Sequence, residues 1–371
     1  MVGSRRIGRA AAAGLLPMLL AAGASGAASR AVSGPILIRT ADRSGTTHLV
    51  VVDGGQRRTV PTVGTNPDEA SGSRDGAQLA YVTELKDRSA VLYSQRVDGS
   101  ERRRLVLAPA TCPSNTCAGI RFAWGPGDQL AVAFADALGW HLEVLAADGA
   151  LVRELSPRPG PDVSYWNISW SPDGRWLGFT RYAGVEGSTT CCVNEYDVVR
   201  PDGSGLRTVF SAAEPIHDTP VVRWAPDGTR LAFATDARAA GDPALAILDI
   251  PSGTVHRLRR YPAGGSVPSW SPDGRRIAFA ALVPLRGGFF MRRVVIAAPD
   301  GTPQGTLAAP GAPVDVTWSP DGARLLVTVA PSPDAQAREV HIVHPTGGTA
   351  SAVIRLPHGS GVLDAEWASR G

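Results

Sequence analysis

Residues 270–279 read WSPDGRRIAF, and this stretch decides the fold because the chain repeats it. Five related stretches and a final fragment, WASRG, recur at intervals of 46 to 54 residues; they begin at Gly72, Trp124, Trp170, Trp224, Trp318 and Trp367. Six of the nine tryptophans stand at this one place in the repeat. A period of this length, without a helical pattern, is typical of the blades of a β-propeller.

Each repeat divides into four short strands. In the copy around Trp224 we expect strands at residues 221–224, 231–235, 244–250 and 254–258. The first two are joined by Pro-Asp-Gly, in which proline sets φ, aspartate bonds its own backbone and glycine accepts positive φ. A second glycine turn precedes the fourth strand. Four strands per repeat make one blade.

The two ends of the chain supply one further blade. Residues 35–40, 48–53 and 58–61 resemble second, third and fourth strands without a first, and residues 361–367 resemble a first strand with nothing after it. We therefore predict an all-β, seven-bladed β-propeller of four-stranded antiparallel blades. The ring is closed by pairing of the N- and C-terminal strands.

The first thirty residues have the composition of an export signal. A basic start is followed by an apolar run and then by small residues, so we predict a signal peptide at 1–30 and a single propeller domain at 31–371. The apolar run is short and interrupted by Gly14 and Pro17, and no stable membrane span is expected after cleavage. The mature protein is expected in the periplasm or outside the cell. The pair Arg5-Arg6 leaves twin-arginine and general secretion both open.

Four cysteines in an exported chain favour disulfides. Cys112 and Cys117 lie in the loop that enters the second full blade, and the adjacent Cys191 and Cys192 lie in a long loop of the third. A bridge between neighbours is strained. Two arrangements therefore remain open. One has local bridges, Cys112 with Cys117 and Cys191 with Cys192, and is slightly preferred; the other has two bridges that join the two loops.

The repeat resembles the TolB-type propeller repeat, W-S-P-D-G-x-x-[IL]-A-[FY], over essentially the whole mature chain. The resemblance implies an exported or cell-envelope binding platform. TolB itself has an α/β domain ahead of a six-bladed propeller, and neither feature is expected here. Related repeats occur in propeller lids of prolyl-oligopeptidase-like peptidases, but the mature chain has no G-x-S-x-G nucleophile motif.

Candidate ligand-binding residues lie on what we call the loop face. This face carries the loops between blades and the loops between second and third strands, whereas the two glycine turns of each blade lie on the opposite face. Ligands are expected on the loop face because its loops vary on a rigid scaffold. The candidates precede the repeated motif or lie in blade-joining loops: Glu69, Arg121, Tyr165, Trp166, Asn167, His217, Asp218, Asp315, His358 and Asp364.

Structural alternatives exist for each candidate. The acidic residues could bond neighbouring blade backbones, and Tyr165 and Trp166 could pack within a blade. His217 and His358 could be solvated loop residues. Arginines in or beside the fourth strands, such as Arg57, Arg58 and Arg257, are expected to protect the outer blade edges from pairing with other chains.

We predict a non-enzymatic binding or scaffold protein that recognises a protein, peptide or glycan of the envelope or extracellular space. No nucleic-acid partner is expected, since the formal net charge is only +3. No cofactor is expected either. One alternative is a metal-assisted polysaccharide lyase of the oligogalacturonate-lyase type, using His217, His358 and nearby acids. A purely architectural module of an envelope complex is another.

Overall fold

The computed structural model describes residues 34–64, 66–109, 119–156, 163–183, 193–212, 222–234, 244–262, 266, 268–284, 290–332 and 335–367. These residues form seven four-stranded antiparallel sheets. Among them, no helix is long and apolar enough to cross a lipid bilayer.

Six blades are built from consecutive strands and are numbered in chain order. Blade 1 contains β4 (Pro67–Gly72), β5 (Gln78–Glu84), β6 (Ala90–Arg96) and β7 (Arg103–Ala108); blade 2 contains β8 (Arg121–Trp124), the 3₁₀ turn η1 (Pro126–Asp128), β9 (Leu130–Asp136), β10 (Gly139–Leu145) and β11 (Leu151–Glu154). Blade 3 contains β12 (Val163–Trp170), β13 (Leu177–Ala183), β14 (Val193–Val199) and β15 (Arg207–Ala212); blade 4 contains β16 (Val222–Trp224), β17 (Arg230–Ala234), β18 (Ala244–Asp249) and β19 (Thr254–Pro262). Blade 5 contains β20 (Ser269–Trp270), β21 (Ile277–Pro284), β22 (Phe290–Ala297) and β23 (Pro303–Leu307); blade 6 contains β24 (Ala312–Trp318), β25 (Leu325–Ala330), β26 (Glu339–Val343) and β27 (Ser351–Arg355).

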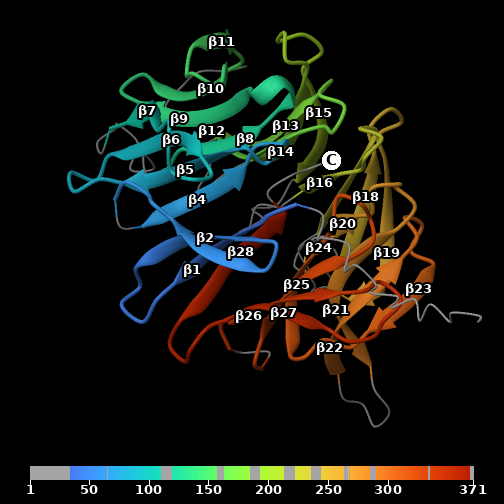
Figure 1. Ribbon diagram of the computed structural model, residues 1–371. Coiled ribbons are helices and arrows are strands. Elements are labelled where there is room, and N and C mark those ends of the chain that lie inside the picture. Colours follow the sequence, from blue (N-terminus) through green and yellow to red (C-terminus); the bar gives the residue numbers. More distant parts are fainter. Residues whose placement is uncertain are drawn as a thin grey trace, which may run out of the picture. The chain divides into compact units, whose positions relative to one another are not determined.

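The seventh blade joins the two ends of the described chain. Its strand order is β28 (Gly361–Trp367), β1 (Ile36–Ala41), β2 (Thr47–Asp53) and β3 (Gln56–Val60). Figure 1 shows the red strand β28 beside the blue strand β1, and the two are antiparallel, with Ile36 opposite Trp367. The predicted seven-bladed propeller and its closure are both confirmed.

First strands line the inside of the ring. Each of β4, β8, β12, β16 and β20 contacts the first strand of the next blade. Blade 7 joins the series through contacts of β28 with β25 and of β1 and β2 with β4. Apolar clusters lie between adjacent sheets, as in the cluster that combines Trp140 of blade 2 with Trp170 and Phe179 of blade 3. Sheets packed face to face in this way hold the inner strands at fixed positions.

The repeated Ser-Pro-Asp-Gly stretch is a turn held by its own side chains. In blade 5, the Ser271 hydroxyl donates to Asp273 Oδ1 at 2.5 Å, and the Arg275 amide donates to the same oxygen at 3.1 Å. Gly274 has φ of 66°, a conformation that favours glycine. Trp270, Pro272, Asp273 and Gly274 therefore build the fold.

The tryptophan of the motif bonds the preceding blade in blades 2 to 5. The indole N–H of Trp124 donates to the Ser71 carbonyl at 3.0 Å, and that of Trp170 donates to the Ala123 carbonyl at 3.1 Å. The acceptor each time is the residue just before the equivalent position of the preceding blade. Trp270 bonds the Arg223 carbonyl in the same way and Trp224 bonds the Ser169 hydroxyl, whereas the indole nitrogens of Trp318 and Trp367 have no hydrogen-bond partner among the described residues. What all six motif tryptophans share is burial of the ring in an apolar cluster.

Candidate binding site at the loop face

Four neighbouring blades place charged and aromatic side chains together at the loop-face end of the inner strands. We call this set the mouth cluster; its residues are Arg39, Asp68, Glu69, Arg121, Trp166 and Asp364. Blade 7 supplies Arg39 and Asp364, and blade 1 supplies Asp68 and Glu69. Arg121 comes from blade 2 and Trp166 from blade 3. Four of the six were predicted from the sequence.

Two arginines link the carboxylates of the cluster. Arg39 donates to Asp364 Oδ2 from Nε at 2.7 Å, and its second guanidinium nitrogen lies 2.7 Å from the same oxygen. The remaining nitrogen of Arg39 is 3.9 Å from Asp68 Oδ1. Arg121 lies 4.0 Å from Asp68 Oδ2 and 3.8 Å from Glu69 Oε2. Asp68 therefore connects the two arginines across three blades.

Irregularities in the strands explain how neighbouring acids reach one arginine. Successive side chains of a regular strand point to opposite faces, yet Asp68 and Glu69 both lie within ion-pair distance of Arg121. The pairing of β4 with β5 shifts by one residue between Pro67 and Glu69, so Asp68 is the extra residue of a bulge. A bulge re-aims side chains. It places both carboxylates on the same side.

An aromatic ledge adjoins the charged groups. The guanidinium carbon of Arg121 lies 4.3 Å from the centre of the Trp166 ring, a cation–π contact. Trp166 also packs against Tyr182 edge to face at 6.4 Å and against Trp140 at 6.0 Å. Its indole N–H donates to the Ser164 hydroxyl at 3.1 Å. These contacts fix the ring while its side chain stays partly exposed.

Burial disfavours the charged form of two acids of the mouth cluster, Glu69 and Asp364. Burial raises the pKa of Glu69 to about 7 against the attraction of Arg121, with Asp68 adding repulsion. Burial between the inner strands also raises the pKa of Asp364, against the attraction of Arg39 and with further repulsion from Glu366 and Asp315, although solvent still reaches 46% of the Asp364 side chain. By contrast, the Ser271 hydroxyl and the Arg275 amide lower the pKa of the turn residue Asp273. Asp273 is thus stabilised as a carboxylate, whereas Glu69 and Asp364 are not.

Other predicted residues take different positions. Tyr165 is fully buried and packs edge to face against Phe179 at 5.6 Å, so it belongs to the blade core and offers no ligand surface. Asn167 adopts φ of 49° at an irregularity of β12, and its amide donates to the Thr180 hydroxyl at 3.3 Å. Asp315 is half-buried on β24. It acts on the mouth cluster only through its charge.

His358 is exposed in the loop before β28, where its backbone carbonyl accepts from Arg43 Nε at 2.8 Å. Six of the predicted residues lie outside the described residues: His217, Asp218, Cys112, Cys117, Cys191 and Cys192.

Arg39 and Asp68 were missed from the sequence. Arg39 is the only charged residue in the strand ILIRTA, and a single charge within an apolar second strand is a usable signal. Asp68 stands beside the predicted Glu69, and only the bulge shows that both matter.

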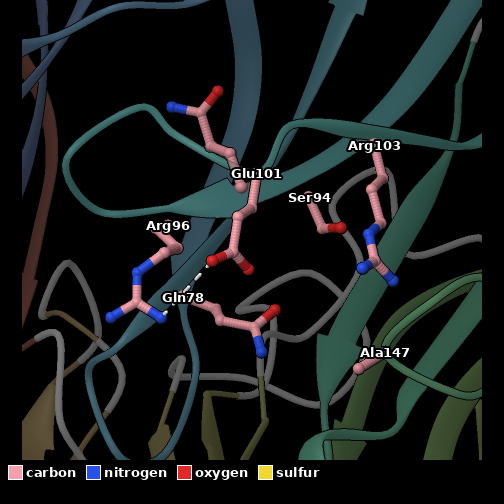
Figure 2. Close-up of a pocket in the computed structure, with 7 residues that line it drawn as sticks. Gln78, Ser94, Arg96, Glu101, Arg103 and Ala147 are labelled. Atoms are coloured by element: carbon pink, nitrogen blue, oxygen red, sulfur yellow. Dashed lines mark ion pairs between the residues drawn. The ribbon is translucent and has the colours of Figure 1, made fainter.

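Hollows also occur away from the mouth cluster. Figure 2 shows one of about 90 Å³, lined by side chains of blade 1 and by Ala147, with Arg96 facing Glu101 at 3.9 Å. That volume holds only a few water molecules, at about 30 Å³ each. A larger hollow of about 1010 Å³ lies along the outer strands of blades 4 and 5 and includes Arg230, His256 and Asp300.

Solved structures resemble this chain at the level of the fold. TolB from Acinetobacter baumannii is 18% identical over 73% of this chain, with a TM-score of 0.47, and the aligned part spans 62% of that protein. A puromycin-hydrolysing peptidase from Mycobacterium tuberculosis is 17% identical over 88% of this chain and 54% of its own, with a TM-score of 0.56. The β-propeller domain of the trilobed protease from Pyrococcus furiosus is 12% identical over 86% of this chain and 91% of its own, with a TM-score of 0.57.

No protein-family model matches the sequence. No curated protein matches it either. The chain is a seven-bladed β-propeller, and its likeness to these solved structures, all at most 18% identical, shows the fold alone. The fold alone therefore does not select a function.

Proposed function

We propose that this chain is an exported, non-enzymatic binding protein whose mouth cluster receives a basic segment of a partner protein or peptide. The observation that carries the proposal is the imbalance of charge at the mouth. Asp68, Glu69 and Asp364 face two arginines, and Asp315 and Glu366 add repulsion to Asp364. Burial is the main cause of the raised pKa of Glu69 and of Asp364, and repulsion from neighbouring acids adds to it. A lysine or arginine from a ligand would supply the missing positive charge.

The aromatic ledge suits the same ligand. The ring of Trp166 makes a cation–π contact with Arg121 at 4.3 Å. The guanidinium or ammonium group of a ligand could make a cation–π contact with the same ring. Leu363, which is 41% exposed beside Asp364, adds an apolar contact on the inner strand. Acidic, aromatic and apolar groups side by side fit a peptide with basic and apolar side chains better than a polyuronate, which is itself anionic.

The test is a comparison of peptides that differ in charge alone. Fluorescently labelled peptides of equal length, alternating alanine with lysine, arginine or glutamate, are titrated with the purified protein and followed by anisotropy. We expect the basic peptides to bind, more tightly at low salt, and the acidic peptide to bind at least tenfold more weakly. Equal binding of basic and acidic peptides, or no binding of either, would overturn the proposal.

Variants locate the binding to the mouth. Asp68→Asn and Trp166→Ala are each expected to weaken binding of the lysine peptide about two- to fivefold, the range for one exposed charge pair or cation–π contact. Glu84→Gln is the matched control, because Glu84 is an exposed acid at the end of β5 in the same blade. If Glu84→Gln weakens binding as much as Asp68→Asn, the effect is one of net charge and the mouth is not the site.

Export is part of the same proposal and has a separate test. Residues 1–30 are proposed as a signal peptide and 31–371 as the mature domain. The protein is expressed with a C-terminal tag in a bacterium, and the periplasmic and medium fractions are collected. We expect a mature protein there whose N-terminal sequence begins near residue 30; full-length protein confined to the cytoplasm would contradict export. The alternative lyase would need His217, which lies outside the described residues, and His358, which is outside the mouth cluster.

A further inference from the structure

A histidine and two glutamates meet on the outer strands of blade 2, away from the mouth cluster. His141 and Glu143 are two residues apart on β10 and therefore share one face of the strand. Glu154 on β11 pairs directly with Glu143. One nitrogen of His141 and one oxygen of each glutamate all lie within 4.8 Å of one another, a spacing at which a single metal ion can contact all three.

The orientation of His141 is a separate observation that points to a cation. Its Nε2 lies 3.0 Å from Asp136 Oδ1, which can only accept a proton, so this contact holds the ring proton at Nε2. The Nδ1 lone pair of the neutral ring then lies 3.8 Å from Glu154 Oε2. Two hydrogen-bond acceptors that face each other repel unless a proton, a metal ion or a water molecule lies between them. A carboxylate that holds the far nitrogen of a histidine is also the usual support of a metal ligand.

Neighbouring contacts hold the other groups in place. The Ser156 hydroxyl donates to Glu154 and accepts the Leu142 amide at 2.8 Å. The His141 ring stacks on Phe134 with centres 5.1 Å apart. The side chain of His141 is 19% exposed and that of Glu154 is 45% exposed, so an ion can enter from solvent.

We propose that His141, Glu143 and Glu154 bind one divalent transition metal ion of the zinc class, with Asp136 as the positioning residue. An imidazole ligand favours zinc, cobalt or nickel over magnesium and calcium, which prefer oxygen ligands only. Three protein ligands leave at least one position for water. The site is independent of the mouth cluster and of its proposed ligand.

A proton is the competing occupant. If His141 is doubly protonated, it pairs with Asp136 through one nitrogen and with Glu154 through the other, and no metal is required. Metal binding and protonation exclude each other, because the ligand must be a neutral imidazole. A direct measurement can therefore decide between them.

The test is calorimetric titration of the chelator-treated full-length protein with zinc chloride at pH 7.5, with magnesium chloride in parallel. We expect one equivalent of zinc at this site and no magnesium. Cobalt should give visible absorption bands of a nitrogen–oxygen site. Glu154→Gln and His141→Ala should each weaken zinc binding at least tenfold, and Asp136→Ala should weaken it about tenfold.

His48→Gln is the matched control. His48 pairs with Asp42 at 3.1 Å on blade 7 in the same manner, and it is not among the grouped metal ligands of the described residues. Glu154→Gln guards against misfolding, because that side chain is half exposed. Equal zinc affinity in the wild type and in Glu154→Gln would place the ion elsewhere and overturn the proposal. So would absence of zinc binding, which would assign the cluster to a protonated His141.

Discussion

Replacement of Glu69 by glutamine should make the protein more stable at high pH. The pKa of Glu69 rises from 4.5 to about 7, chiefly through burial. The folded protein therefore holds this proton more tightly than the unfolded chain does, and the free energy of unfolding falls as the pH rises from 4.5 through 7. Glutamine is neutral at every pH, so the variant lacks this loss.

The size of the effect follows from the pKa values. At 1.36 kcal/mol per pKa unit, a rise from 4.5 to about 7 corresponds to at most roughly 3.4 kcal/mol. Because 34% of the side chain is exposed, solvent screening reduces the effect to about 1–2 kcal/mol. Glu69→Gln should thus match the wild type near pH 4.5 and exceed it by about 1–2 kcal/mol at pH 8.5.

Urea unfolding followed by tryptophan fluorescence measures this difference. Curves are recorded for the wild type, Glu69→Gln and Glu84→Gln at half-unit steps from pH 4.5 to 8.5. Glu84 is exposed on the same blade, and its replacement is expected to leave the pH profile unchanged. A stability difference for Glu69→Gln that is constant across this range would refute the reasoning, because a packing effect does not titrate.

Three further predictions concern the blades. Asp197→Asn should cost about 3 kcal/mol in urea unfolding, the low end for a broken buried pair, because Arg181 donates to Asp197 at 2.8 Å but also pairs with Glu195; no loss of stability would show that the pair contributes nothing net. Gly125→Ala should cost about 1–3 kcal/mol, since an added Cβ would lie 2.5 Å from the Trp170 ring, whereas Gly305→Ala meets nothing within 4 Å and serves as the control. Below pH 3.8 the urea concentration at the unfolding midpoint should fall, because serine hydroxyls lower the pKa of Asp75 and that of Asp273 and this stabilisation is lost as both protonate. Replacing both aspartates by asparagine should make the midpoint fall less steeply below pH 3.8.

The repeat made the fold predictable because six copies of one sequence pattern each form the turn between a first and a second strand. A proline, an aspartate and a glycine in order can form few turns, and the residues around Gly274 form the one expected. Strand bounds in the repeat around Trp224 agree with the prediction to within about one residue, except that β19 runs on to Pro262. Exposed arginines on β3 and β7 also stand at the blade edges, as expected.

The mouth cluster was only partly predictable because it depends on strand irregularities. Counting three residues back from the motif found Glu69, Arg121 and Asp364, but in blade 3 the same count gives Asn167. β12 has one extra residue between Trp166 and Ser169, so the residue three places before its motif is no longer the structurally equivalent one. Trp166, not Asn167, contacts Arg121. Bulges have no reliable sequence signal here, and side chains near them cannot be assigned to a face by alternation.

The direction of the pKa shifts separates the acids that build the fold from those that the fold does not need. Among the described carboxylates, Glu69, Glu143 and Asp364 have a raised pKa, and all three lie in the mouth cluster or beside His141. Glu69 and Glu143 lie outside the closing strands, whereas Asp364 also pairs with Arg39 across β28 and β1. Destabilising charges that persist at such places are candidates for function. Glu69→Gln should therefore show two effects together: a gain in stability at high pH and a loss of affinity for the lysine peptide. A variant that gains stability and keeps its affinity would remove Glu69 from the binding site.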